Sequence, residues 1–189
     1  MKKQKKVNLN LGCGDNVQKD FINYDIVKPF NADKSFIQGD AREMPFEKES
    51  IDYILCDQVL EHIPLVDIVT VLHEIRRILK KGGQCIIQVP DFTSAVQDWL
   101  SVNMNEGFDP ITYHYVTEVI YGNQQHEGEY HKTAMSAGLL HYSLNVAGLK
   151  NHKIKLFPKN GEIPIYEGMR NSPPSARLRN SQLVCEIIK

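Results

Sequence analysis

The sequence predicts an α/β fold built on an open sheet that is at least partly parallel, and three observations support this prediction. Short apolar runs bounded by turn residues recur through the first 90 residues, as expected of buried strands. An amphipathic helix pattern separates two of these runs, which makes a βαβ unit with a right-handed crossover. The first run ends at a glycine pair, Gly12 and Gly14, and bare backbone at such a strand end is typical of ligand sites.

Length and composition predict one domain over residues 1–189, because a chain of this length with 42% hydrophobic residues can bury one sizeable core. The formal net charge of −1 argues against nucleic acid or an acidic membrane as a partner. No apolar run reaches membrane-spanning length, and the basic start lacks the apolar core of a signal peptide, so we expect a cytoplasmic protein. The cysteines form no C-x-x-C pair, and we expect four reduced core residues: Cys13, Cys56, Cys85 and Cys185.

Four short strands are predicted in the first third of the chain, each apolar or aromatic and followed by turn residues. They cover residues 7–12, 21–26, 35–40 and 51–57. The segments that join them are short, so we expect turns there rather than long helices.

The first clear helix is predicted to begin at Pro64, a residue suited to the first helical turn. Its apolar stripe would consist of Leu65, Ile68, Val69, Leu72, Ile75 and Leu79. Gly82 and Gly83 are expected to end this helix. Residues 84–89 then form another buried strand, which Pro90 closes.

A second amphipathic helix is predicted over residues 132–147, with Gly148 as its terminator. Its inward-facing residues would be Met135, Leu139, Tyr142 and Val146. Strands near 150–157 and 181–188 would complete the sheet. Two long segments fall outside this regular pattern, residues 91–131 and residues 158–180, and such segments are often functional.

Aspartates follow three of the predicted strands. In an open α/β sheet, ligands bind outside the carboxyl ends of the strands, near the point where the strand order reverses. Asp25, Asp40 and Asp57 each stand at such an end. We expect Asp25 to accept hydrogen bonds from a pair of ribose hydroxyls, and Asp40 to accept one from an exocyclic amine. Each aspartate alone is more typical of a turn or a helix cap, so the hypothesis of a nucleoside site depends on their order along the chain.

Several motifs together resemble those of the class I S-adenosylmethionine-dependent methyltransferases. "LNLGCG" is similar to the first motif of that family, and "NYDI" is similar to its ribose-binding strand end. "GDAREMPFEKESIDYILCDQVLEHI" resembles the adenine loop, the fourth strand and the turn after it, and "ILKKGGQCIIQVP" resembles the next helix and strand. "YHKTAMSAGLLHYSLNVAGLK" resembles a helix that follows the insertion in many small members. The resemblance implies a doubly wound, mostly parallel seven-stranded sheet of Rossmann-like type, with an antiparallel last strand and a helical lid inserted at about 91–131.

The resemblance also implies which residues bind the cofactor, S-adenosylmethionine. Position by position, it assigns Gly12, Cys13 and Gly14 to the methionine and ribose portion, Asp25 to the ribose, Asp40 and Ala41 to the adenine edge, and Asp57 with Gln58 to the border of the sulfonium. Asn10 is counted with them, although an acidic residue is usual there and asparagine weakens any salt link to the amino group of the cofactor. Asn16 stands where a third glycine is frequent, and asparagine tolerates left-handed backbone.

A nicotinamide site is the alternative for the glycine pair, and the spacing disfavours it. A dinucleotide fingerprint requires G-x-G-x-x-G, whereas Val17 occupies the third position here. Asp25 follows Gly14 by only eleven residues, and not by the ~20 residues that such a fingerprint requires. S-adenosylmethionine carries no phosphate, so it does not require a helix N-terminus close to the glycines.

Three further sets of residues are candidates, each with a structural alternative. Glu61 and His62 could act as acid and base, or His62 could pack beneath the cofactor loop and help cap the next helix. One set could bind a metal: His126, Glu127, Glu129 and His131. Its spacing matches no familiar site, so we expect no metal there. Another set could stack on a substrate ring or pack into the core: Tyr113, Tyr115, Tyr121 and Tyr130.

His131 is the predicted catalytic residue. It ends the insertion that should close the pocket, so the chain returns it toward the strand ends. A neutral imidazole at that place could take a proton from an acceptor hydroxyl. The alternative is that its ring anchors the lid through a backbone hydrogen bond.

The resemblance therefore implies an enzyme that moves a methyl group from S-adenosylmethionine to an oxygen or nitrogen of a small molecule. Compact relatives with such a short first crossover are similar to enzymes of sugar or surface-glycan pathways, which favours a sugar or glycan precursor as the acceptor. The alternative is a catalytically silent S-adenosylmethionine-binding sensor or interaction module. The oligomeric state stays open.

Overall fold

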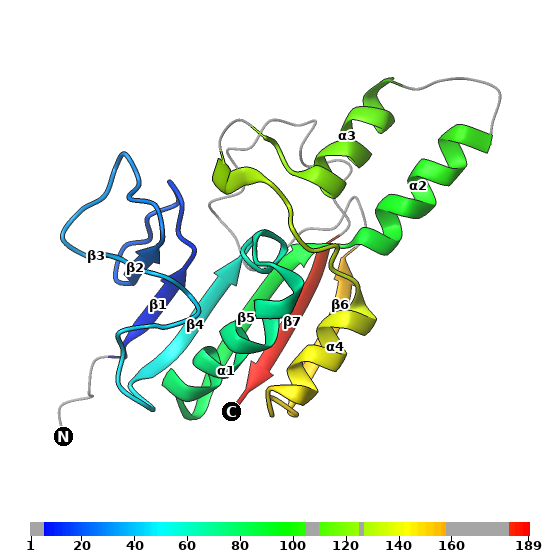
Figure 1. Ribbon diagram of the computed structural model, residues 1–189. Coiled ribbons are helices and arrows are strands. Elements are labelled where there is room, and N and C mark those ends of the chain that lie inside the picture. Colours follow the sequence, from blue (N-terminus) through cyan, green and yellow to red (C-terminus); the bar gives the residue numbers. More distant parts are fainter. Residues whose placement is uncertain (1–5, 105–109, 125–126, 158–181) are drawn as a thin grey trace.

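The computed structural model describes residues 6–104, 110–124, 127–157 and 182–189 (Figure 1). This part of the chain contains seven strands: β1 Asn8–Leu11, β2 Ile22–Asp25, β3 Phe36–Gln38, β4 Ile51–Asp57, β5 Leu79–Pro90, β6 His152–Phe157 and β7 Gln182–Ile188. It contains four α-helices: α1 Ile68–Ile78, α2 Phe92–Met104, α3 Pro110–Tyr121 and α4 Ala137–Val146. It also contains three short 3-10 turns: η1 Leu60–His62, η2 Leu65–Asp67 and η3 Glu127–Glu129.

The strands form one sheet in the order β3-β2-β1-β4-β5-β7-β6. Each neighbouring pair from β3 to β5 is parallel, whereas β7 runs antiparallel to both β5 and β6. The chain runs outward from β1 to β3 and then returns to β4, so the strand order reverses between β1 and β4. The predicted fold, a doubly wound and mostly parallel seven-stranded sheet with an antiparallel last strand, is confirmed.

A buried polar network links the first strands of the sheet. As the sequence predicts, the described connections between β1 and β4 contain turns and no α-helix. Asn23 on β2 accepts hydrogen bonds from Asn10 Nδ2 (2.9 Å) and from the Gln18 backbone N–H (2.8 Å). Its own amide donates to Ser35 Oγ over 2.8 Å. Since buried amides must be hydrogen-bonded, these contacts fix β1, β2 and the turn before β3 relative to one another.

The first α-helix starts later than predicted. Pro64 is followed by the 3-10 turn η2, and α1 begins only at Ile68. A 3-10 turn advances the chain by fewer residues than an α-turn, so the apolar stripe changes phase. Leu65 is consequently 57% exposed, Val69 is only half-buried, and Val71 is buried in place of them.

The first α-helix also ends earlier than predicted. Leu79 has extended backbone and begins β5, so the helix stops at Ile78 and not at the glycine pair. Gly82 and Gly83 lie within β5 instead. Gly82 has a φ of +74°, and the pairing of this part of β5 with β4 changes register.

The second helix of the sheet is shorter than the predicted 132–147. Ser136 has extended backbone, and its hydroxyl accepts a hydrogen bond from the Leu139 N–H over 3.2 Å, which makes it the N-cap of α4. The helix therefore begins at Ala137. Gly148, with a φ of +77°, follows its end as expected.

The buried face of α4 differs by one residue from the predicted stripe. Leu140 and Leu144 are buried, whereas Tyr142 is 66% exposed and Val146 is also exposed. One residue corresponds to a rotation of about 100° around the helix axis. Met135 is buried as predicted, but it packs from the extended chain before the helix.

Helices α1 and α4 contact each other and lie on the same face of the sheet (Figure 1). Their buried side chains join those of the strands in one core cluster, which includes Leu9, Ile54, Leu72, Ile87 and Leu144. All four cysteines are buried and free, as the sequence predicts.

The insertion leaves the sheet at the carboxyl end of β5. The Asp91 carboxylate accepts hydrogen bonds from the Ser94 N–H (3.0 Å) and hydroxyl (2.6 Å), which fixes the start of α2. Helices α2 and α3 contact each other and extend from the upper end of β5, on the side of β7 and β6 (Figure 1). Helical structure in residues 91–131, at the edge where the parallel strands end, is therefore confirmed.

No helix in the described part of the chain has both the length and the apolar character that crossing a bilayer requires. The long segment predicted at 158–180 lies outside the described residues.

Candidate functional site

The carboxyl ends of β1 and β2 bring two predicted site residues into contact. Gly14, after β1, donates its backbone N–H to Oδ2 of Asp25, at the end of β2, over 2.8 Å. Gly12 and Cys13 both donate to the Tyr24 carbonyl, over 2.7 and 3.2 Å. The glycine loop is thus folded against the end of β2, next to the point where the strand order reverses. Gly14 and Asp25 form one edge of the candidate site.

The two glycines of this loop are required for different reasons. Both have left-handed backbone, with φ of +67° at Gly12 and +46° at Gly14. A Cβ on Gly12 would lie 2.3 Å from Cγ2 of Val59, so internal packing excludes a side chain there. A Cβ on Gly14 would meet no atom within 4 Å. Open space for a ligand therefore lies at Gly14, whereas Gly12 closes the loop against the residues after β4.

Asn10 and Cys13 support the loop from the protein side. Asn10 is buried, and its amide donates to the Asn16 carbonyl and to Asn23 Oδ1, each over 2.9 Å. Cys13 is buried as well, and burial raises the pKa of its thiol to about 11. A direct contact between Asn10 and a cofactor stays a prediction, and both hydrogens of its amide are already used within the protein.

Asp25 keeps acceptor capacity although both of its oxygens bind backbone. Oδ2 accepts from Gly14, and Oδ1 accepts from the Val27 N–H over 2.9 Å. A carboxylate offers about four lone-pair positions, so each oxygen can accept one more hydrogen bond. Ile26 follows directly and is 60% exposed, an apolar neighbour within the "NYDI" motif for which the sequence predicted no role. These features fit a ligand that has two hydroxyl groups next to an apolar ring.

Asp40 is held by its neighbour Arg42. The guanidinium donates to both carboxylate oxygens over 2.6–3.0 Å, and the Arg42 N–H donates to Oδ1 over 2.9 Å. These hydrogen bonds lower the pKa of Asp40 below its usual value. An exocyclic amine could bind Asp40 only if Arg42 moved, so the adenine role of Asp40 stays a prediction. Ala41 is half-buried against the core.

Buried polar atoms without partners occur at the ends of β4 and β5. In the described part of the chain, five buried side-chain atoms have no hydrogen bond to another residue: Oδ1 of Asp57, both oxygens of Glu61 and both amide atoms of Gln88. Burial raises the pKa of Asp57 to about 6 and that of Glu61 to about 8. Unpartnered buried polar atoms are rare in native proteins, and a bound ligand is one way to satisfy them.

Gln88 was not predicted as a site residue, although it lies opposite Asp57 in the pairing of β4 with β5. Gln88 lies in residues 84–89, whose apolar pattern is typical of a buried strand. A polar glutamine near the end of such a strand was the one feature of the sequence that could have indicated a site residue. Gln58 turns away with a φ of +54°, and its amide donates to Oε1 of Gln182 on β7 over 2.7 Å. The side chain predicted beside the sulfonium is therefore bound to β7, which lies on the far side of β5 from β4.

His62 and His131 meet where the insertion contacts η1. Their ring centroids lie 4.9 Å apart in an edge-on arrangement. His131 Nδ1 lies 2.8 Å from the Val119 carbonyl oxygen, and His62 Nδ1 lies 3.2 Å from that of Tyr130. Burial lowers the pKa of both imidazoles, so both are neutral at pH 7. His131 thus makes the backbone hydrogen bond expected of an anchor, and its catalytic role stays a prediction.

Only some of the remaining candidates of the insertion have side chains that the structure describes. Several of them lie outside the described side chains: Tyr113, Tyr115, His126 and Glu127. Tyr121 and Tyr130 are exposed, so neither packs into the core. Within the described part of the chain, His131 is the one member of the predicted metal set that lies in a group of metal-binding residue types, together with Glu61 and His62.

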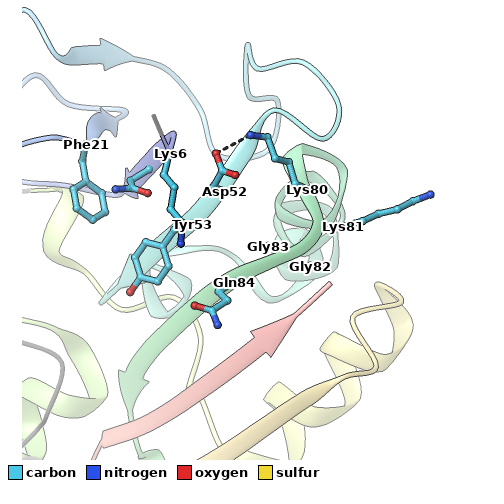
Figure 2. A pocket seen from close by; sticks show the side chains of 10 residues that line it. Lys6, Phe21, Asp52, Tyr53, Lys80, Lys81, Gly82, Gly83 and Gln84 are labelled. Carbon is cyan, nitrogen blue, oxygen red and sulfur yellow. Dashed lines mark hydrogen bonds and ion pairs between the residues drawn. The ribbon is translucent and has the colours of Figure 1, made fainter. Parts of the chain in front are cut away.

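A hollow of about 510 Å³ lies at the opposite, amino-terminal ends of the strands (Figure 2). Asp52, Lys80 and Gln84 are among its lining residues, and Lys80 Nζ lies 2.7 Å from Asp52 Oδ2. Ligands of open α/β sheets bind outside the carboxyl ends of the strands, and the glycine loop lies at that edge. We therefore assign the functional site to the carboxyl edge and no ligand to this hollow.

Comparison with known sequences matches residues 9–87 to a family described as "Methyltransferase domain". An uncharacterized protein of Methanocaldococcus jannaschii is 34% identical over 100 residues, which span 48% of this chain and 43% of that protein. The chain thus matches less than half the length of this relative.

Comparison with solved structures shows that the fold is shared with methyltransferases. A SAM-dependent methyltransferase from Archaeoglobus fulgidus is 14% identical, with a TM-score of 0.62 over 97% of this chain and 86% of that chain. A 1,6-didemethyltoxoflavin-N1-methyltransferase from Burkholderia thailandensis, solved with 1,6-didemethyltoxoflavin and S-adenosylhomocysteine, is 14% identical with a TM-score of 0.59, over 97% of this chain and 70% of that chain.

Proposed function

We propose that this chain is a class I S-adenosylmethionine-dependent methyltransferase, which transfers a methyl group from S-adenosylmethionine to an oxygen or nitrogen of a small molecule. The contact between Gly14 and Asp25, beside open space at the strand-order switch, supports this proposal best. At this contact, a nucleoside would meet backbone without a side chain at Gly14 and a carboxylate with free acceptor positions at Asp25.

The residues at the strand ends fit the parts of the cofactor. Asp25 would accept hydrogen bonds from two ribose hydroxyls, and the exposed Ile26 would contact the adenine ring. Asp40 and Ala41 would border the adenine edge. Asp57 would face the positive charge of the methionine portion, since its unpartnered oxygen would gain an attractive partner there.

S-adenosylmethionine, when bound, supplies a methyl group on a sulfonium sulfur, which leaves as a neutral thioether when a lone pair of the acceptor takes the methyl. The protein contributes alignment, and positioning of two reactants can lower a barrier by about 7–11 kcal/mol. Helices α2 and α3 would hold the acceptor and exclude water at this edge (Figure 1). His131 would take the proton of a hydroxyl acceptor on Nε2, because Nδ1 is bound to the Val119 carbonyl.

We favour a hydroxyl of a sugar or glycan precursor as the acceptor. The net charge of −1 gives no field that would select a highly charged polymer.

Calorimetry and a transfer assay test this function. We expect S-adenosylmethionine and S-adenosylhomocysteine to bind and NAD not to bind. Methyl-labelled S-adenosylmethionine with a panel of sugars, nucleotide sugars, phenols and amines should then give labelled product. Binding of NAD with neither sulfur compound overturns the cofactor assignment. Binding of the sulfur compounds without transfer to any acceptor favours the silent binding module instead.

A further inference from the structure

Glu61, His62 and His131 converge where the insertion returns to the sheet. One donor atom of each residue lies within 4.8 Å of the donor atoms of the other two. Glu61 and His62 belong to η1, directly after β4, whereas His131 stands at the far end of the insertion. The fold alone brings them together, which is why no sequence motif indicated this cluster.

Main-chain contacts hold the two segments of the cluster in place. The N–H groups of Lys132 and Thr133 both donate to the Glu61 carbonyl, over 2.7 and 3.0 Å. The Thr133 hydroxyl donates to the Ile63 carbonyl over 2.6 Å. The residue after His131 and the backbone of Glu61 are thus bonded directly, so the cluster does not depend on chance proximity of surface side chains.

The hydrogen bonds of the two histidines leave one nitrogen of each ring available for a ligand. Nδ1 of His62 lies 3.2 Å from the Tyr130 carbonyl oxygen, and Nδ1 of His131 lies 2.8 Å from that of Val119. A carbonyl oxygen only accepts hydrogen bonds, so both Nδ1 atoms carry the proton and both Nε2 atoms carry a lone pair. Metal-binding histidines typically show this pattern, in which the second ring nitrogen donates to a backbone carbonyl or a carboxylate.

The carboxylate of Glu61 is buried without a partner. Glu61 is 1% exposed, and neither of its oxygens accepts a hydrogen bond from another described residue. Burial of an unpaired carboxylate is strongly unfavourable. A cation that displaces the proton of Glu61 would be bound by its carboxylate and by the two imidazole lone pairs, and would satisfy all three groups at once.

We propose that Glu61, His62 and His131 bind one divalent transition-metal ion through a carboxylate oxygen and the two Nε2 atoms. Two imidazoles and one carboxylate are a donor set that zinc and neighbouring first-row metals use in proteins. Magnesium and calcium prefer oxygen ligands, so the two imidazoles disfavour them.

Formation of the site would require the three ligand atoms to move closer together. The ligand atoms of a tetrahedral zinc ion lie about 3.3 Å apart, given metal–ligand distances of about 2.0–2.1 Å. The donor atoms here lie within 4.8 Å of one another. Metal binding would have to draw the three side chains closer while the Nδ1 hydrogen bonds of both histidines are kept.

The metal site gives His131 a different role from that of a general base. Three protein ligands leave at least one coordination position open. This consequence rests on the proposed function: an acceptor hydroxyl would occupy that position, and the metal would lower its pKa. One Nε2 atom cannot both bind a metal and accept a proton, so the two roles of His131 are alternatives.

Metal binding can be measured without an activity assay. The protein is freed of metal with a chelator, dialysed and titrated with Co²⁺, whose visible absorption reports the coordination. Calorimetry follows Zn²⁺ and Mg²⁺ in parallel. We expect one Co²⁺ per chain, its displacement by Zn²⁺, and no binding of Mg²⁺.

Variants connect the binding to the three residues. Loss of a partner in the outer shell typically weakens a metal site 10–100-fold, so Glu61→Gln and His131→Ala should each weaken Co²⁺ binding by about 100-fold or more. His141→Ala is the matched control. His141 Nδ1 lies 2.9 Å from His152 Nε2 in a second, exposed histidine pair, and its loss should leave the affinity unchanged.

Stoichiometric binding that both variants lose and His141→Ala keeps supports the site. No stoichiometric binding by the wild type, or binding that Glu61→Gln and His131→Ala leave intact, overturns it. Circular dichroism checks that each variant folds, and His62→Ala replaces any variant that does not. S-adenosylhomocysteine calorimetry on the same samples separates the two proposals, because its failure in a metal-binding wild type counts against the proposed function alone.

Discussion

Alanine at Gly12 tests whether internal packing or the ligand shapes the glycine loop. Gly12 has a φ of +67°, and left-handed backbone costs a residue with a Cβ about 1–2 kcal/mol. The new Cβ would also lie 2.3 Å from Cγ2 of Val59, and overpacking of a buried site typically costs about 1–3 kcal/mol. We therefore expect Gly12→Ala to lower the free energy of unfolding by about 2–5 kcal/mol.

Two comparisons separate the backbone cost from the clash. Gly14→Ala is the matched control, since Gly14 is also left-handed but a Cβ there meets no atom, so it should cost only about 1–2 kcal/mol. Val59→Ala removes the clashing methyl groups. The double variant Gly12→Ala with Val59→Ala should lose about 1–3 kcal/mol less free energy of unfolding than the two single variants lose together.

Urea unfolding followed by far-ultraviolet circular dichroism gives these free energies. Equal losses for Gly12→Ala and Gly14→Ala, or additive losses in the double variant with Val59→Ala, would refute the packing argument. Gly14→Ala should instead weaken S-adenosylhomocysteine binding, because its methyl group enters the open space beside Asp25.

The remaining predictions concern the site and its supports. Asp25→Ala should weaken S-adenosylhomocysteine binding at least about tenfold, since it removes two charge-assisted hydrogen bonds of about 1.5–3 kcal/mol each; unchanged affinity of the folded variant in calorimetry would contradict the ribose assignment. Glu74→Gln should destabilise the protein by about 1–3 kcal/mol at neutral pH, because the carboxylate accepts hydrogen bonds from Arg77 and from the Met44 N–H. These bonds lower the pKa of Glu74 below 4.5. In urea unfolding, the wild type should therefore be more stable than Glu74→Gln above pH 4.5, and this difference in the free energy of unfolding should disappear as the pH falls through the folded-state pKa. A difference that does not change with pH would contradict this role of Glu74. His131→Ala should lower kcat about 10²- to 10⁴-fold at saturating cofactor while S-adenosylhomocysteine affinity is kept, and full activity would remove His131 from the reaction. Hydrogen exchange in residues 91–131 should slow when S-adenosylhomocysteine binds, and indifference to the ligand would leave the insertion as scaffold.

The strands could be predicted from the sequence because their signal is local. Each is a short apolar run between turn residues, and β4 agrees with its prediction at both ends. The ends of the helices depend on tertiary contacts, which the spacing of apolar residues in the sequence does not reveal. Lys132 and Thr133 donate their N–H groups to the Glu61 carbonyl, which holds this segment against η1. The helix begins only after Ser136, whose extended backbone and hydroxyl form the N-cap.

Site residues could be predicted where the strand order alone places them, but not where their position depends on contacts between side chains. Gly14 and Asp25 follow neighbouring parallel strands, so their proximity was expected from the order of the strands alone. The pairing of Asp40 with Arg42 depends on the turn between them, although two opposite charges so close in sequence were a usable signal. The approach of His131 to Glu61 depends on the path of the whole insertion, which no short window of sequence contains.

The polar network around Asn23 should affect how the half of the sheet with β1, β2 and β3 behaves in solution. Around β1, β2 and β3, hydrogen bonds among Asn10, Gln18, Asn23 and Ser35 act where the other half has two packed helices, α1 and α4. Such a region has fewer apolar contacts to lose, so it should form a separate cooperative unit that opens at a lower free energy than the rest of the sheet. A ligand that binds both Gly14 and Asp25 would stabilise the folded form of this unit. The cellular concentration of the cofactor would then determine the fraction of molecules in which the unit is folded.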